Sequence, residues 1–270
     1  MSATTERVTA ARSGRNTRKT LARQAIALRS ATIAAAVVAW ELVARGPMRH
    51  NDFLAAPSKV VTDGLSFVLQ PDTLLALWQT TFRFLIAFLI VAVAGSALGL
   101  VMGRLHRHIF LGARDVVTVL YALPMVPFYP LFVLWAGLGT RSEIAFGVIH
   151  GMIPVILMTM SASAQVEPNL ISSGETMGAS RFQRLLFIIV PSVLPDIVSA
   201  LKIGAALTLL GVLLAELMIS INGVGSFITN QITNHQAAWL NAIVLVVCLG
   251  AVVINTGLGW IERRASRWRT

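Results

Sequence analysis

Long apolar stretches alternate with short polar ones along this 270-residue chain. A helix needs about 20 mostly apolar residues to cross a bilayer. The stretches that meet this requirement are Ile26–Val43, Thr81–Met102, Val116–Leu138, Ile144–Ser163, Leu194–Ile219 and Leu240–Ile261. The pattern therefore predicts an all-α membrane protein with six transmembrane helices, of which the third and fifth are interrupted.

The composition supports the membrane class. The chain is 56% hydrophobic and only 13% charged, whereas soluble domains carry about 25% charged residues. Its one cysteine, Cys248, lies in an apolar stretch. We expect it to be a buried filler, because free cysteine behaves as a small hydrophobic residue.

The basic residues gather in alternate polar segments. Of the 22, seven precede or open the first apolar stretch, three separate the second from the third, two lie in residues 164–191 and four close the chain. Positive residues collect on the cytoplasmic side, so the distribution predicts a multi-pass protein with both termini in the cytoplasm. The same distribution explains the net charge of +10 without nucleic-acid binding.

The chain divides into two regions. Residues 1–24 are rich in Ser, Thr, Ala and Arg, and we expect a disordered basic tail beside anionic lipid. The long apolar run that follows, without a clear cleavage site, argues against a signal peptide. Residues 25–270 form the predicted six-helix transmembrane domain.

A polar segment, residues 164–191, interrupts the domain between the fourth and fifth stretches. Pro168 favours a helix start, Gly178 a helix end, and Ser180 can cap the next helix. These signals predict two short helices, bent at the glycine, across the cytoplasmic face. An ordinary connecting loop is the alternative.

This segment resembles the EAA loop of ABC-importer permeases. Gly178, Ile188 and Pro191 fall at the family spacing, while Val190 replaces a leucine and Ser172–Gly174 stand where the family has Glu-Ala-Ala. Four other motifs also resemble the nitrate, sulfonate and taurine type of permease. They are "LAAPSKVV" (54–61), "TTFRFLIAFLIVAVAGSALGLVMG" (80–103), "ALPMVPFYPLFVLWAGLG" (122–139) and "LLAELMISINGVGSFI" (213–228).

The resemblance implies a type I importer fold and a set of partners. The permease would work in the bacterial inner membrane as a dimer, with two cytoplasmic ATPases that bind ATP and Mg²⁺ and with an external binding protein or lipoprotein. This chain would bind no cofactor or metal. The residues implied in coupling to the ATPase are Ser172, Ser173, Gly174, Glu175, Gly178, Ala179, Ser180 and Arg181.

The proline-rich third stretch is a candidate substrate pathway. Prolines spaced three apart should free the carbonyls of Leu120, Leu123 and Val126, and unpaired backbone is tolerated where it lines a wet cavity. A bent packing helix is the alternative. The candidate lining residues are Pro124, Met125, Pro127, Phe128, Tyr129 and Pro130.

Three of the charged residues within the apolar stretches are candidates for a role in gating or structure. Lys202 is expected to reach the headgroups at the cytoplasmic side. Glu216 lies toward the outer end, where an intramembrane acid is a functional candidate. It could pair with Arg83, hold a gate shut or contact substrate. Gly95, Gly99 and Gly103 form a stripe that predicts close helix packing.

The sequence favours a transport subunit over two other classes. A phosphate-binding GxxxxGK[ST] loop is missing, so ATP hydrolysis is expected on a separate protein. A channel or secondary transporter is the alternative, although we see no internal repeat, and a membrane enzyme lacks a catalytic constellation. A small organic solute is favoured, such as a sulfonate, taurine, an aromatic acid or a pyrimidine precursor, and nitrate also fits the scaffold.

Overall fold

The computed structural model describes residue 24 and residues 27–48, 54–219, 221–234 and 236–266. These residues form helices and loops and contain no β-strand. Five helices within them are long and apolar enough to cross a membrane, and a bent helix pair gives a sixth crossing if it counts as one span. The predicted all-α membrane class is confirmed, and the basic tail at 1–24 lies outside the described residues except for Gln24.

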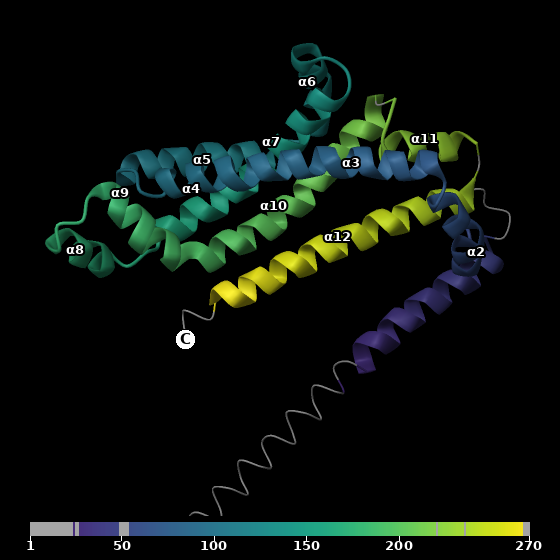
Figure 1. Cartoon of the computed structure of the whole chain (residues 1–270), viewed down its shortest axis with the longest axis horizontal. Coiled ribbons are helices and arrows are strands. Elements are labelled where there is room, and N and C mark those ends of the chain that lie inside the picture. The colour runs from purple at the N-terminus through teal and green to yellow at the C-terminus, as the bar shows by residue number, and fades with distance from the viewer. Residues whose placement is uncertain (1–23, 25–26, 49–53, 220, 235, 267–270) are drawn as a thin grey trace, which may run out of the picture.

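The N-terminal helix, Ala27–Arg45, projects away from the rest of the bundle (Figure 1). Only 6% of its most apolar window is buried. Its C-terminal end lies beside α2 (Pro57–Val68), where Trp40 packs against Val60 and Ala242. A helix this apolar requires cover from lipid or from another chain.

The second span begins earlier than the hydropathy pattern predicts. It comprises α3 (Pro71–Ile90), the π-helical turn η1 (Val91–Gly95) and α4 (Ser96–Met102). Together these elements form one continuous crossing of 32 residues. Pro71 lies in the first turn of α3, where its missing N–H costs no helical hydrogen bond.

The predicted glycine stripe lies against α7 (Thr140–Ala164), as expected for helix packing. A Cβ added to Gly99 would lie 2.7 Å from the Cβ of Thr159, and one added to Gly103 would lie 2.4 Å from the carbonyl oxygen of Met160. The absence of side chains therefore lets the two helix backbones approach closely.

The third span is broken more sharply than a kinked helix. It consists of α5 (Arg107–Ala122), the 3₁₀ turn η2 (Val126–Phe128) and α6 (Tyr129–Ala136). The α5 and η2–α6 parts meet at an angle of 86°. In Figure 1, α6 rises out of the layer that contains α5.

The prolines of this span begin helical turns instead of distorting a continuous helix. Pro127 and Pro130 lie in the first turns of η2 and α6. The expectation of freed carbonyls is wrong for two of the three positions. Leu120 accepts from the backbone N–H of Leu123, and Val126 accepts from that of Tyr129.

The centre of the bundle is the crossing of α7 with α10 (Val190–Ile219). Small residues make this crossing tight. A Cβ added to Gly151 would lie 1.9 Å from Oγ1 of Thr208 and 2.9 Å from the carbonyl oxygen of Gly204. Any larger side chain at Gly151 would force the two helices apart.

The polar segment between α7 and α10 contains one short helix, not the two predicted. This helix, α8 (Pro168–Thr176), has nine residues. The expected second short helix continues without interruption through α9 (Arg181–Arg184) and the π-turn η3 (Leu185–Ile189) into α10. The combined helix has 39 residues. It does not end after Arg184, because the apolar run that follows continues the helix directly into α10.

The last two elements are α11 (Val224–Thr233) and the spanning helix α12 (Ala237–Ala265). In Figure 1 the C-terminal end of α12 lies on the same side of the bundle as α8 and α9, and α2 and α11 lie on the opposite side. We call these two sides the α8 end and the α11 end. Cys248 of α12 is exposed, so the expectation of a buried filler was wrong.

Candidate functional site

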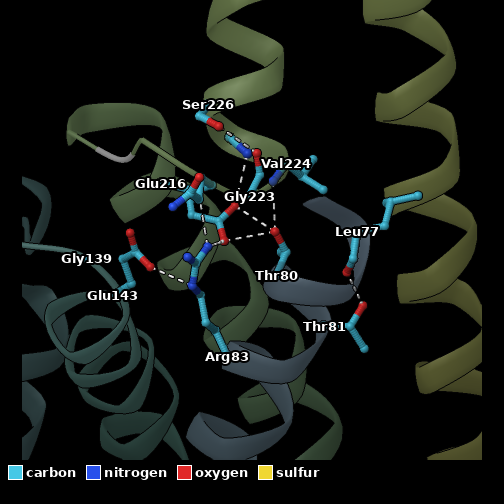
Figure 2. Close-up of polar contacts among 12 residues, drawn as sticks. Leu77, Thr80, Thr81, Arg83, Gly139, Glu143, Glu216, Gly223, Val224 and Ser226 are labelled. Carbon is cyan, nitrogen blue, oxygen red and sulfur yellow. Dashed lines mark hydrogen bonds and ion pairs between the residues drawn. The ribbon is translucent and has the colours of Figure 1, made fainter. Parts of the chain in front are cut away.

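A cluster of buried charged side chains lies at the α11 end of the bundle. Arg83 of α3 reaches between Glu143 of α7 and Glu216 of α10 (Figure 2). The three residues expose 4%, 0% and 1% of their surface, respectively. Three helices that are distant in sequence are thus joined through one guanidinium group.

Arg83 forms an ion pair on each side. Its Nη1 lies 2.6 Å from Oε1 of Glu216, and its Nε lies 2.7 Å from Oε2 of Glu143. Nη1 also donates to the backbone carbonyl of Asn222 at 3.2 Å. The guanidinium group therefore holds the loop after α10 as well as the two acids.

Glu216 has a more complete set of partners than Glu143. The hydroxyl of Thr80 lies 2.8 Å from both carboxylate oxygens of Glu216, and the backbone N–H of Gly225 donates to Oε2 at 3.0 Å. The Thr80 hydroxyl in turn accepts from the backbone N–H of Val224 at 2.9 Å. The Glu143 oxygens have no hydrogen-bond partner among the described residues beyond the Arg83 ion pair.

Two glycines let the loop before α11 close over this cluster. A Cβ added to Gly223 would lie 2.4 Å from Nη1 of Arg83 and 2.5 Å from Oε1 of Glu216. Gly223 also has a φ of 96°, which strongly favours glycine. A Cβ added to Gly225 would lie 2.4 Å from Cβ of Glu216. Glycine at these two positions therefore lets the backbone lie directly against Arg83 and Glu216.

The cluster contains two acids and one base. Each charge was costly to bury, and removal of the one base would leave both acids uncompensated. The Arg83–Glu216 pair was among the arrangements expected from the sequence, but Glu143, Thr80 and Gly225 were not identified. Glu143 directly precedes the apolar stretch at Ile144, and its position within the first turn of a spanning helix was the available signal.

The predicted coupling loop projects from the α8 end. The hydroxyls of Ser172 and Ser173 donate to the carbonyls of Pro168 and Asn169, four residues earlier. Both serines are exposed. These two positions therefore present a small polar surface, where the resemblance leads one to expect Glu and Ala.

The third departure from the EAA pattern has a packing reason. Gly174 is buried, and a Cβ added there would lie 2.4 Å from Cδ1 of Ile188. Next to it, Glu175 forms an ion pair with Nη1 of Arg184 at 3.2 Å. The α8 helix thus lies directly on α9 and η3, through one close contact and one partly exposed charge pair.

The turn between α8 and α9 has specific caps on both sides. Gly178 has a φ of 79°, and the N–H groups of Gly178 and Ala179 donate to the carbonyls of Glu175 and Gly174. This is a Schellman ending. Ser180 then starts α9 with a capping box, in which its hydroxyl accepts from Gln183 N and its own N–H donates to the Gln183 side chain. The turn therefore has a fixed geometry, and we call it the joint at Gly178.

The outer surface of this joint is apolar and basic. Met177 exposes 86% of its surface and Phe182 exposes 70%. Arg181 is also exposed. Beside it, a cavity of about 470 Å³ is lined by Arg104, Arg181 and Arg184 together with apolar residues of α4 and η3.

The predicted pathway residues do not form one surface. Tyr129 exposes only 1% of its surface and packs edge-on against Phe146, with ring centroids 5.1 Å apart. Phe128 exposes 41%. Met125 packs against the buried group of Tyr129, Phe146 and Ala215. Pro124, Pro127 and Pro130 lie at the bend between α5 and α6. The expectation that Tyr129 faces a route is not met in this conformation.

Lys202 is placed differently from the prediction. Its Nζ donates to Oε2 of Glu262 on α12 at 2.9 Å, and Ser199 donates to the other carboxylate oxygen. The Lys202 side chain exposes 29% of its surface and that of Glu262 exposes 28%. Lys202 thus pairs between helices instead of extending to the headgroups, because an acid 60 residues later lies within its reach.

Comparison with known proteins gives a consistent result. The chain is 27% identical over 255 residues to the taurine transport system permease protein TauC of Escherichia coli, covering 92% of this chain and 91% of the relative. It is 23% identical over 234 residues to the putative aliphatic sulfonates transport permease protein SsuC of Bacillus subtilis, covering 86% and 84%, respectively.

The fold also matches a solved structure, that of the MetNI methionine ABC transporter in inward-facing conformations. The TM-score is 0.60 at 17% identity, with 70% of this chain and 93% of the other covered. Residues 95–269 match the family described as the binding-protein-dependent transport system inner membrane component. The chain therefore belongs to this family of inner-membrane transport permeases.

Proposed function

We propose that this permease forms the membrane pathway for a small organic solute, delivered by an external binding protein and driven by two cytoplasmic ATPases. Relatives named for taurine and aliphatic sulfonates support this solute class, as does one named for formylaminopyrimidine. In this proposal ATP and Mg²⁺ bind the ATPases, and a second copy of the chain completes the pathway.

The observation that carries the proposal is the joint at Gly178. A short polar helix, α8, lies outside the spans and rests on the first turns of a 39-residue helix that crosses the bundle. A movement imposed on α8 is therefore transmitted directly to α10. The exposed Met177 and Phe182 beside the joint are suited to insertion into a cleft of the ATPase.

The other end of the same helix carries Glu216 in the charge cluster. At 1.5 Å per residue, the 35 positions from Arg181 to Glu216 span roughly 50 Å. The helix thus connects the proposed ATPase contact with a cluster that holds α3, α7 and the loop before α11. We assign the cluster to closure of the outer side of the pathway.

This assignment also sets the orientation. The α8 end, with the C-terminal end of α12 beside it, is the cytoplasmic side in this proposal, and the α11 end faces the binding protein. The N-terminal basic tail then lies in the cytoplasm as well. The basic residues near the α8 end, among them Arg104 and Arg181, agree with the positive-inside rule.

Reconstitution tests the proposal against a channel or a secondary transporter. The full chain is placed in liposomes with its partner ATPase and binding protein, and solute uptake is measured with and without ATP. We expect uptake to require ATP, and hydrolysis to rise when loaded binding protein is added. Solute flux through the chain alone, without an ATPase, would contradict the proposal.

A further inference from the structure

A polar groove runs along α7 and α10 toward the α8 end. Two adjoining cavities of about 540 Å³ and 590 Å³ share Met158 and Ser199 in their walls. The first adds polar groups of Ser161, Gln165 and Asp196. The second adds those of Tyr121, Lys202 and Asn255.

These groups belong to helices that are otherwise strongly apolar. The most apolar 18-residue windows within the spans of α10 and α12 have mean hydropathies of 2.2 and 2.6. Polar side chains at such depth face protein or water instead of lipid, because hydrocarbon offers them no hydrogen-bond partner. The groove is therefore a wet surface, and it leads from Asn255 toward the end of α7 at Gln165.

Lys202, which lines the second cavity, forms an ion pair with Glu262 that is only partly shielded. Lys202 and Glu262 lie 2.9 Å apart and keep 29% and 28% of their side chains exposed. Ser199 holds the second oxygen of Glu262 in place. In contrast, the Arg83 cluster is sealed, so the Lys202–Glu262 pair is the one of the two that a solute can reach.

We propose that this groove is the cytoplasmic section of the solute pathway, and that the Lys202–Glu262 pair selects a zwitterion. This inference rests on the transport function proposed above. A solute with one cation and one anion can exchange partners with the pair, its anion binding Lys202 and its ammonium binding Glu262. Every charge then keeps an opposite partner.

A simple anion cannot make this exchange. When it binds Lys202, it displaces Glu262 and leaves that carboxylate without its paired ammonium and with only its chain neighbour Arg263 as a nearby cation, which is less favourable. Taurine and isethionate separate the two cases well. They share the sulfonate and the two-carbon chain, and they differ in having an ammonium or a hydroxyl group at the other end.

The test is equilibrium binding of radiolabelled taurine and isethionate to the full permease in lipid nanodiscs. Neither the ATPase nor the binding protein is needed for this binding measurement. The reconstitution described above tests the transport proposal separately, so the two proposals can fail independently. We expect taurine to bind about tenfold more tightly, the scale of one charge-assisted hydrogen bond. Glu262→Gln should remove this preference by weakening taurine binding.

Glu41→Gln is the matched control, because Glu41, like Glu262, pairs with a basic residue (Arg45), but lies on the N-terminal helix far along the chain from the groove. The control should retain the preference for taurine. Equal binding of the two probes to the unmodified protein overturns the inference. So does a preference that persists in Glu262→Gln, and so does failure of either probe to bind at millimolar concentration.

Discussion

Replacement of Arg83 with methionine tests the buried charge cluster directly. Methionine retains much of the aliphatic volume but removes the cation between Glu143 and Glu216. Both acids are almost completely buried, so neither gains solvent in place of the lost partner. Breaking a buried ion pair from one side costs about 3–5 kcal/mol.

The single acid substitutions should cost less, and they should differ from each other. Glu143→Gln removes the excess acid and leaves Arg83 paired with Glu216, so we expect a loss of about 1 kcal/mol or less. Glu216→Gln places an amide NH₂ among the donors of Arg83, Thr80 and Gly225. That clash should cost about 2 kcal/mol.

Thermal unfolding of the purified permease in one detergent measures the series. At about 2–4 °C per kcal/mol for a chain of this size, Arg83→Met should lower Tm by roughly 6–20 °C. Glu143→Gln should stay within roughly 4 °C of the unmodified protein. Fluorescence-detected gel filtration after heating gives the midpoint without an activity assay.

A triple variant provides the control for lost packing. Arg83→Met combined with Glu143→Gln and Glu216→Gln removes every charge of the cluster, and neutral replacements of a whole buried ion cluster are often tolerated. Its Tm should lie above that of Arg83→Met alone. If Glu143→Gln destabilises as much as Arg83→Met, or if the triple variant is the least stable, the electrostatic account of the cluster is refuted.

Three further predictions concern other parts of the fold. Gly178→Val should abolish binding-protein-stimulated ATP hydrolysis and weaken ATPase copurification while membrane insertion persists, because valine is strongly disfavoured at positive φ. Gly178→Asn, in which the asparagine tolerates that conformation, should retain both the stimulated hydrolysis and the copurification of the ATPase. Gly151→Ala should lower Tm because its Cβ meets Thr208, whereas Gly250→Ala on α12, with open space around it, should not; equal shifts would contradict the tight α7–α10 crossing. In a cysteine-free background, a cysteine at Phe128 should react with a polar thiol reagent and one at Tyr129 should not, and equal labelling would show that α6 moves.

The spans could be located from the sequence because the hydropathy of a segment depends only on its own residues. The predicted fourth span, Ile144–Ser163, differs from α7 by a few residues at its start and one at its end. The larger errors occurred where a helix continues past its apolar part. The span predicted to begin at Leu194 begins at Arg181, since capping by Ser180, not hydropathy, decides where that helix starts.

The sites were less predictable because they depend on residues that are distant in sequence. Arg83 and Glu216 are 133 positions apart, and periodicity within one helix gives no information on such a pair. Lys202 was expected to extend to the headgroups because Glu262 belongs to another span. The helix boundaries within residues 164–191 were easier to predict, since the start at Pro168, the end at Gly178 and the cap at Ser180 are all local signals.

The two ends of α10 differ in a way that bears on how transport would be coupled. At the α8 end, contact with the coupling helix depends on the fit of Gly174 against Ile188 and one partly exposed pair, Glu175–Arg184. At the α11 end, Glu216 is sealed among charged and backbone partners. Under the function proposed above, a load applied at α8 acts first on these contacts, and the cluster at the α11 end yields only when the whole helix moves. In that proposal the order suits an importer, because the α11 end stays closed until the ATPase has moved α8.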